Sequence, residues 1–197
     1  MAESPFEMPR EELYRIGDPA ENQRRGKRFR SLLQKAWAAP LASWGFVGKG
    51  SLFRRRQGSV LEVVQTQAWK YGGGLCVNLG VHFDFLARRP GSPTRLDDFE
   101  EFHCVLRRRL APAPRVGDFW WRYGCDASES QACVNHLVAT LGQDGMAFFE
   151  RVGGLPGGYA DLTEEQAKEF LGGLLFPAQG QVWSLVQEIR AHLEEKK

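Results

Sequence analysis

The side chains best suited to chemistry in this sequence lie in one segment of alternating polarity, residues 75–86. Its apolar residues take every second position: Leu75, Val77, Leu79, Val81, Phe83 and Phe85. Small or polar residues take the positions between them: Cys76, Asn78, Gly80, His82 and Asp84. Because successive side chains of a β-strand point to opposite sides, this period of two predicts a strand with one apolar and one polar face.

Two neighbouring segments extend the predicted polar face. Gln65 and Gln67 share one side of the predicted strand 60–68, although two apolar residues lie on that side as well. A strand at 102–110 would add His103, Arg107 and Arg109 to this face if it pairs with the central segment. Together these side chains form a candidate surface for an anion, a peptide or a small polar ligand. Its predicted members are Gln65, Gln67, Asn78, His82, Asp84, His103 and Arg107.

Three interpretations of this surface remain open. Histidine titrates near neutral pH, so His82 or His103 could act as a general acid or base while Arg107 binds an anionic substrate. An antiparallel sheet also commonly leaves one face in water, where polar side chains are simply solvated. We favour the solvated face over catalysis and place noncatalytic binding between the two. No catalytic residue is therefore assigned.

No metal ion or cofactor is predicted. Cys133-x-x-His136 would place two ligands on one helical turn, but structural zinc sites normally combine two short paired spacings. His82, His103 and Asp84 would resemble a two-histidine-one-carboxylate set only if the assumed strand pairing holds. The sequence also has no phosphate-binding P-loop, no dinucleotide-binding fingerprint after a strand and no nucleophile elbow.

Composition indicates an ordinary globular chain. Its 197 residues are 43% hydrophobic and 12% aromatic, which excludes a wholly disordered protein and allows a sizeable core. The formal charge of +2 is too balanced to indicate nucleic-acid binding. No apolar run is long enough to span a bilayer, and the first residues lack a secretory signal. We therefore expect a cytoplasmic protein with four reduced cysteines and no membrane contact.

The elements that position the polar face begin with a helix. Apolar residues recur at helical spacing over residues 21–38, ahead of a proline at position 40. Short β-prone segments separated by turn residues follow, which favours an antiparallel meander. These segments are 46–49, 51–56, 60–68 and 75–86. A polar loop at 87–101 then leads to two further predicted strands, 102–110 and 118–123.

The rest of the chain is predicted to be helical. Ser128 with Gln131 and Thr163 with Gln166 have the spacing of capping boxes, and a final apolar stripe begins at Val182. We therefore predict an α+β fold: an antiparallel β-meander of about five to six strands, packed on one face by N- and C-terminal helices. A polar arm at residues 1–19 precedes a single domain at residues 20–197.

A series of short motifs runs through the predicted strands: Trp44-Gly45-Phe46, Lys49-Gly50, Phe53-Arg54, Val63-x-Gln65-x-Gln67, Tyr71 and Asn78-Leu79-Gly80-Val81. Their order and spacing resemble a bacterial family known only as domain of unknown function 4304, from about residue 32 to residue 110 and more loosely to about residue 150. That family has no established activity, so the resemblance constrains the fold more than the chemistry. Related uncharacterised families often lie beside toxin genes, which implies an immunity-like role as one candidate.

The sequence alone does not identify a ligand or a reaction. We predict a noncatalytic binding or protein-interaction module, with a protein as a candidate partner. The alternative is an enzyme that acts on a polar small molecule or nucleic acid with a histidine on the polar sheet face. A third hypothesis, nucleic-acid binding through the basic first helix, is disfavoured by the balanced charge. Gly80 predicts a bulge or a close approach by another backbone or a ligand.

Overall fold

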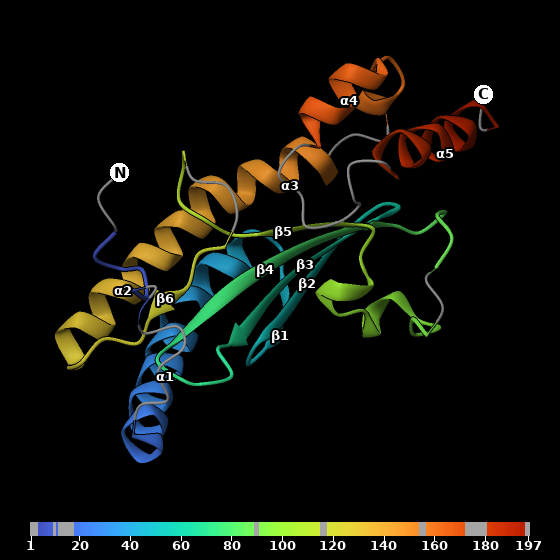
Figure 1. Cartoon of the computed structure of the whole chain (residues 1–197). Coiled ribbons are helices and arrows are strands. Elements are labelled where there is room, and N and C mark those ends of the chain that lie inside the picture. The colour runs from blue at the N-terminus through green and yellow to red at the C-terminus, as the bar shows by residue number, and fades with distance from the viewer. Residues whose placement is uncertain are drawn as a thin grey trace.

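The computed structural model describes residues 4–9, 11, 18–88, 91–114, 118–153, 157–171 and 181–195. Within these ranges, six strands form one antiparallel sheet, and helices from both ends of the chain pack against it (Figure 1). The predicted α+β class is therefore confirmed. None of the helices in these ranges is both long and apolar enough to cross a membrane.

The sheet is a meander with one short addition. Its strands are β1 (Val47–Lys49), β2 (Leu52–Gln57), β3 (Val60–Ala68), β4 (Gly74–Phe83), β5 (Leu106–Arg109) and β6 (Trp121–Arg122). The first five are neighbours in chain order, and β6 pairs with the start of β4. Strand β4 is thus bordered by three other strands, and all ten of its residues are buried.

Five α-helices and four short helical turns complete the described fold. The α-helices are α1 (Pro19–Ser43), α2 (Ala127–Thr140), α3 (Met146–Gly153), α4 (Glu164–Phe170) and α5 (Val182–Glu194). The turns are η1 (Leu96–Asp98), η2 (Glu101–His103), the π-helical η3 (Leu141–Gly145) and η4 (Gly157–Tyr159). Figure 1 shows α2 and α3 in line on one side of the sheet and the turns η1 and η2, in green, on the other.

Both faces of the sheet are covered. The apolar side chains of β4 join one large core with residues of α1, α2, α3 and α5. On the opposite face, Leu96, Phe99 and Cys104 pack against Leu61 and Val63 of β3. The predicted alternation of β4 is therefore confirmed, but the favoured interpretation of its polar face as solvated is wrong. The segment predicted as a polar loop and the residues just after it supply the apolar side chains over this face: Leu96, Phe99 and Cys104. We name residues 96–104 the cover.

The N-terminal arm covers another part of the same face of the sheet. Met8 is only 2% exposed and packs with Trp120 over Cys76 of β4. Its backbone N–H donates to the Trp120 carbonyl at 2.7 Å, and Phe6 stacks on His136 with ring centroids 4.3 Å apart. Residues 4–9 of the predicted arm thus lie against the sheet end that carries β6, and its last residue, Pro19, begins α1.

Several element boundaries differ from the predictions. Helix α1 continues past Pro40 to Ser43: the proline cannot donate a hydrogen bond, but its carbonyl still accepts from the Trp44 N–H at 3.0 Å. The N-cap of α2 is Asp126, two residues before the predicted Ser128 cap, and its side chain accepts from the Glu129 N–H. The predicted box of Thr163 with its partner three residues later is confirmed. The predicted strand 102–110 is correct only from β5 onward, so His103 lies in η2.

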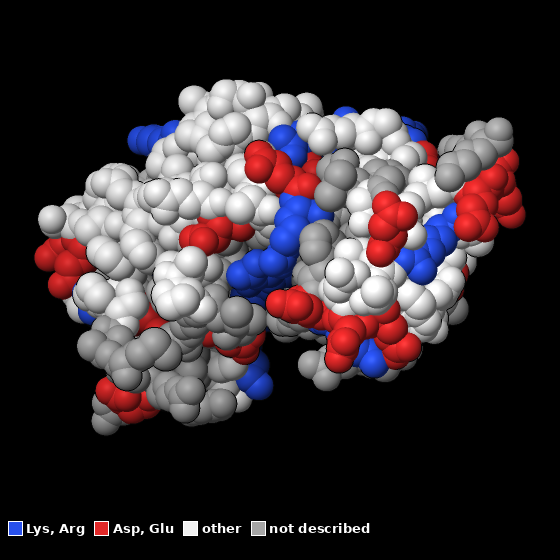
Figure 2. All heavy atoms as spheres, turned by 90° about the horizontal axis from the view of Figure 1, so that it is seen from above, with Lys and Arg blue, Asp and Glu red and all other residues white. Residues whose placement is uncertain are grey.

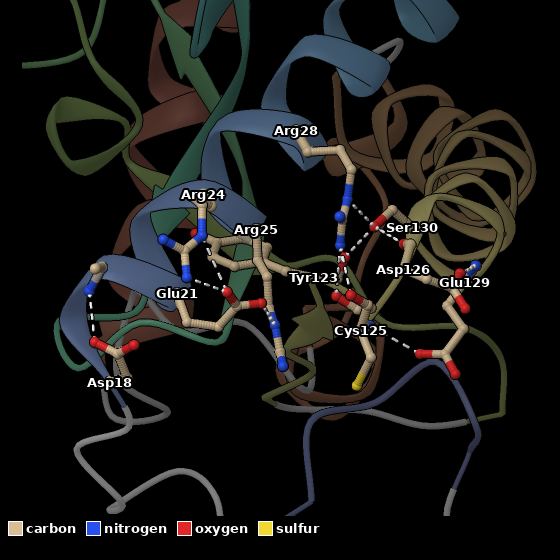
Figure 3. A network of polar contacts seen from close by, with 12 residues as sticks. Asp18, Glu21, Arg24, Arg25, Arg28, Tyr123, Cys125, Asp126, Glu129 and Ser130 are labelled. Atoms are coloured by element: carbon tan, nitrogen blue, oxygen red, sulfur yellow. Dashed lines mark hydrogen bonds and ion pairs between the residues drawn. The ribbon is translucent and has the colours of Figure 1, made fainter.

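Helix α1 is fastened to the start of α2 by one arginine (Figure 3). The Arg28 guanidinium donates to Ser130 Oγ at 3.1 Å and to the carbonyls of Gly124 and Cys125 at 3.2 and 2.9 Å. Ser130 Oγ in turn donates to the Tyr123 carbonyl at 2.6 Å. Because a planar guanidinium presents several donors in fixed directions, a single side chain satisfies three acceptors here.

We expect Arg28→Lys to lower the free energy of unfolding by about 1–2 kcal/mol, because an ammonium group cannot reach all three acceptors. Arg24→Lys is the matched control on the same helix. The Arg24 side chain is 69% exposed and pairs only with Glu21 in the described structure, so its change should stay within about 0.5 kcal/mol. Urea unfolding of both variants measures the difference. Equal stability of the two would contradict the fastening role of Arg28.

Candidate functional site

The strand register brings most of the predicted polar residues together on one face of the sheet. Gln65 lies opposite Asn78, Gln67 lies opposite Cys76, and Gly80 lies opposite Arg107. The two glutamines therefore share the face of Asn78, as predicted. The predicted placement of these side chains on one face is correct. That this face binds a ligand remains a prediction.

Most polar groups on this face bind the chain segment that covers it. Gln65 donates to Glu100 Oε2 at 2.6 Å and accepts from the Glu101 N–H at 2.9 Å. Arg107 makes two bonds to the Glu101 carboxylate, at 2.6 and 3.2 Å. Glu101 is only 3% exposed, so this ion pair is largely removed from water. These contacts hold η2 on the sheet.

A second set of contacts lies beside the first, because Asn78 is opposite Gln65, and it extends toward β6. Asn78 donates to Gln67 Oε1 at 3.1 Å and accepts from Arg109 Nε at 3.3 Å. Arg109 also pairs with Asp118 at 2.7 Å and lies over the Trp120 ring. We name the two sets together the polar seam. Its members are Gln65, Gln67, Asn78, Glu100, Glu101, Arg107, Arg109 and Asp118.

The two histidines proposed as a general acid or base both make contacts within the fold. His82 is 1% exposed, and its ring lies 4.9 Å from that of Phe99. His103 accepts the Glu100 N–H at Nδ1 over 2.9 Å and so caps η2. Asp84 is exposed and pairs with Arg56 at 2.9 Å. In the described structure, no group of three or more His, Cys, Asp or Glu side chains is placed to hold a metal ion.

The missing side chain at Gly80 allows the cover to lie close to the backbone of β4. A Cβ atom at this position would be 2.7 Å from Cys104 Sγ and 3.3 Å from Glu101 Cα. The close approach predicted from a glycine within a strand is therefore made by the chain itself. Four residues earlier in β4, burial raises the pKa of the Cys76 thiol to about 12, so this sulfur stays protonated near neutral pH.

The remaining histidines also lie against aromatic rings. His136 accepts the Trp121 Nε1–H at 3.1 Å, and burial lowers its pKa. His192 stacks on Phe85 with ring centroids 3.8 Å apart. All four histidines of the chain thus contact an aromatic ring. None of them lines either of the two cavities described below.

A cavity of about 380 Å³ lies between α1 and the hairpin that joins β3 to β4. Sequence reasoning missed it, because the glycine run at 72–74 indicated only a turn. We name it the α1–hairpin cavity. Its walls are Pro19, Asn22, Gln23 and Arg30 from α1, Ala68, Trp69, Lys70, Tyr71 and Gly72 from the hairpin, and Tyr123.

Two glycines allow its walls to meet. Gly26 is buried in α1, and a Cβ there would lie 3.0 Å from Arg30 Nη1 and 3.1 Å from Tyr123 Cε2. Gly72 has a φ of +87°, and a Cβ there would come within 2.9 Å of the Asn22 side chain. The left-handed backbone at Gly72 favours glycine and brings the hairpin onto α1.

The cavity combines aromatic rings with positive charge. Arg30 and Lys70 line it, and among its described lining residues none is acidic. Burial raises the pKa of Tyr123, while the neighbouring Arg30 opposes that shift. The phenol is therefore neutral near pH 7 and can donate or accept a hydrogen bond.

A second cavity of about 240 Å³ lies further along α1 and shares one wall residue with the first. That residue is Arg30, so one guanidinium borders both spaces. The other lining residues are Leu33, Gln34, Trp37, Gly50, Ser51 and Thr66. The two cavities follow one side of the helix, with a cation at their boundary.

Comparison with protein families gives a match. A family model described as "Domain of unknown function (DUF4304)" matches residues 37–151, which is more than half of the chain. A search of curated proteins and a search of solved structures each found no match. The matched region spans the whole sheet and ends within α3.

We expect Gln65→Ala to lower the free energy of unfolding by about 1–2 kcal/mol, because it removes the acceptor of the Glu101 N–H under the cover. Gln57→Ala at the exposed end of β2 is the matched control and should change stability by less than about 0.5 kcal/mol. Denaturant unfolding compares them. If Gln65→Ala proves as neutral as the control, the seam does not hold the cover.

Proposed function

The chain belongs to the DUF4304 family, a domain of unknown function, and on that premise we propose that it is a noncatalytic binding module whose ligand site is the α1–hairpin cavity. One observation carries the proposal: this cavity has a volume in the range of small-molecule sites and a wall of aromatic rings, neutral amides and two cations. Such walls bind and orient a ligand.

The lining supports binding more than catalysis. Its ionisable side chains are an arginine, a lysine and two tyrosines, and the burial that raises the pKa of Tyr123 moves it further from neutral pH. General acid–base catalysis works best with groups that titrate near the operating pH. Histidine and carboxylate side chains are missing from the described lining, so no poised proton donor or acceptor faces the space.

The alternative of an enzyme with a histidine on the polar sheet face has less support. A general base must come within hydrogen-bonding reach of its substrate, directly or through one water molecule. The ring of His82 is covered by Phe99, and His103 uses Nδ1 to cap η2. Each of these imidazoles has a structural role that accounts for its position.

Nucleic-acid binding through α1 also has less support. Arg24 and Arg25 pair with Glu21 at 2.7 and 2.8 Å, and Arg28 is engaged by the start of α2 (Figure 3). On another side of the molecule, seen from above, the described basic side chains form separate groups with acidic side chains beside them (Figure 2). Phosphate contacts are favoured by a continuous basic surface, and the described atoms of that side do not form one.

A protein partner is the second candidate ligand. A side chain of the partner would then occupy the cavity, and an immunity-like role is one form of this arrangement. Co-expression of the chain with the product of an adjacent gene tests that form. Protection that depends on Trp69 and Arg30, as walls of the cavity, would support it. Protection unaffected by either substitution would contradict it.

We expect Ala68→Phe to abolish ligand binding, because the ring would fill space that the small side chain leaves open. The measurement is a fragment screen by ¹⁵N NMR that follows the indole N–H of Trp69, assigned with Trp69→Phe. Fragments should shift this signal in the natural chain but not in Ala68→Phe.

The control for this screen is Ala39→Phe, which adds the same ring at an exposed position of α1 outside the cavity lining. It should leave the fragment shifts unchanged. The proposal is wrong if no fragment shifts the Trp69 signal. It is also wrong if the same fragments bind Ala68→Phe with undiminished affinity.

A further inference from the structure

We infer that the ligand of the α1–hairpin cavity is a small molecule in which an aromatic ring is joined to an acidic group, a phosphate or a carboxylate. The inference rests on the proposed function and adds the chemical class of the ligand. Three features of the cavity carry it: the sign of the charge on its walls, the position of its rings and its size.

The charge on the walls is of one sign. Arg30 and Lys70 face a space whose described lining has no carboxylate. The acidic residues beside its α1 wall are already engaged (Figure 3): Asp18 accepts the Ala20 N–H at 3.0 Å, and Glu21 pairs with two arginines. A recess lined by one sign of charge concentrates ligands of the other sign. An anion is therefore stabilised in it, and a cation is repelled.

The rings are held rigidly beside these cations. Trp69 contacts Tyr71 edge-on at 5.8 Å between centroids and contacts Trp120 at 4.6 Å. Lys70 Nζ lies 4.6 Å from the centroid of the Tyr71 ring. Rings that are fixed in advance lose little conformational entropy when a flat ligand stacks on them. A ligand ring on this wall therefore has a cation within reach of any acidic group attached to it.

The size of the cavity and its connection to the second cavity limit the size and shape of the ligand. A volume of about 380 Å³ suits one ring system with its acidic substituent. Arg30 stands at the boundary with the second cavity, which has a volume of about 240 Å³ and polar walls at Gln34, Ser51 and Thr66. An acidic group bound at Arg30 can carry a further polar substituent into that space. A phosphate diester or an acylated amino acid would extend in this way.

Matched pairs of probes test the ligand class by titration with the full chain. Adenosine monophosphate and indole-3-acetate carry the ring and the acid. Adenosine and indole-3-acetamide carry the ring alone, inorganic phosphate carries the acid alone, and tryptamine replaces the acid by a cation. The readouts are the Trp69 indole signal and the dissociation constant at two salt concentrations.

We expect at least one ring acid to bind about tenfold more tightly than its neutral counterpart, with tryptamine weakest. The advantage should shrink as salt is raised. Arg30→Gln should remove most of the advantage, and Lys70→Gln should remove part of it. Lys35→Gln, at an exposed position of the same helix outside both linings, should leave it unchanged. Preference for the nucleotide or for the acetate tells whether the acidic group is a phosphate or a carboxylate.

The experiment distinguishes a wrong ligand class from a wrong binding site. If neutral rings or tryptamine bind as tightly as the acids, and Ala68→Phe abolishes that binding, the ligand class is wrong while the site stands. If inorganic phosphate binds as tightly as the nucleotide, the aromatic part of the inference is wrong. If no probe and no fragment shifts the Trp69 signal, both the class and the site are wrong.

Discussion

Strand β4 is buried along its entire length, and this burial governs what the polar residues of the protein can do. A polar group taken out of water must find a partner inside the protein, or its desolvation costs stability. Asn78 meets this requirement through Gln67 and Arg109. At this position the central strand therefore binds its polar side chain into the seam, and the contacts of Gln65 and Arg107 hold the cover. Side chains engaged in this way are poorly placed to receive a ligand.

The same architecture explains where space for a ligand remains. Helix α1 lies on one face of the sheet and extends beyond it toward the β3–β4 hairpin, where neither sheet nor cover fills the gap. Asn22 bridges that gap by donating to the Tyr71 carbonyl at 3.4 Å, and Gly72 lets the hairpin turn toward the helix. The aromatic and basic side chains around the gap thus belong to elements already fixed by the core. Binding can use them without disturbing the seam.

Local patterns in the sequence determine some of these features and miss others. The period of two correctly predicted which side chains share a face up to Phe83, where β4 ends, because alternation is a property of a single strand; the predicted strand ran three residues too far, to residue 86. It could not predict the cover, since Leu96 and Phe99 stand among charged and turn-forming residues that indicate a polar loop. Nor could it predict the cavity. Asn22 and Tyr71 meet across 49 positions of sequence, and no local pattern records such a contact.

The central claim is that ligands bind at the α1–hairpin cavity and that the polar seam is structural. Crystals of the full chain soaked with a library of small polar and aromatic fragments test it most directly, because each bound fragment reports its own location. The account predicts electron density for fragments between Trp69 and Arg30. Fragments bound instead against Gln65 and Arg107, with the cavity holding only water, would contradict it.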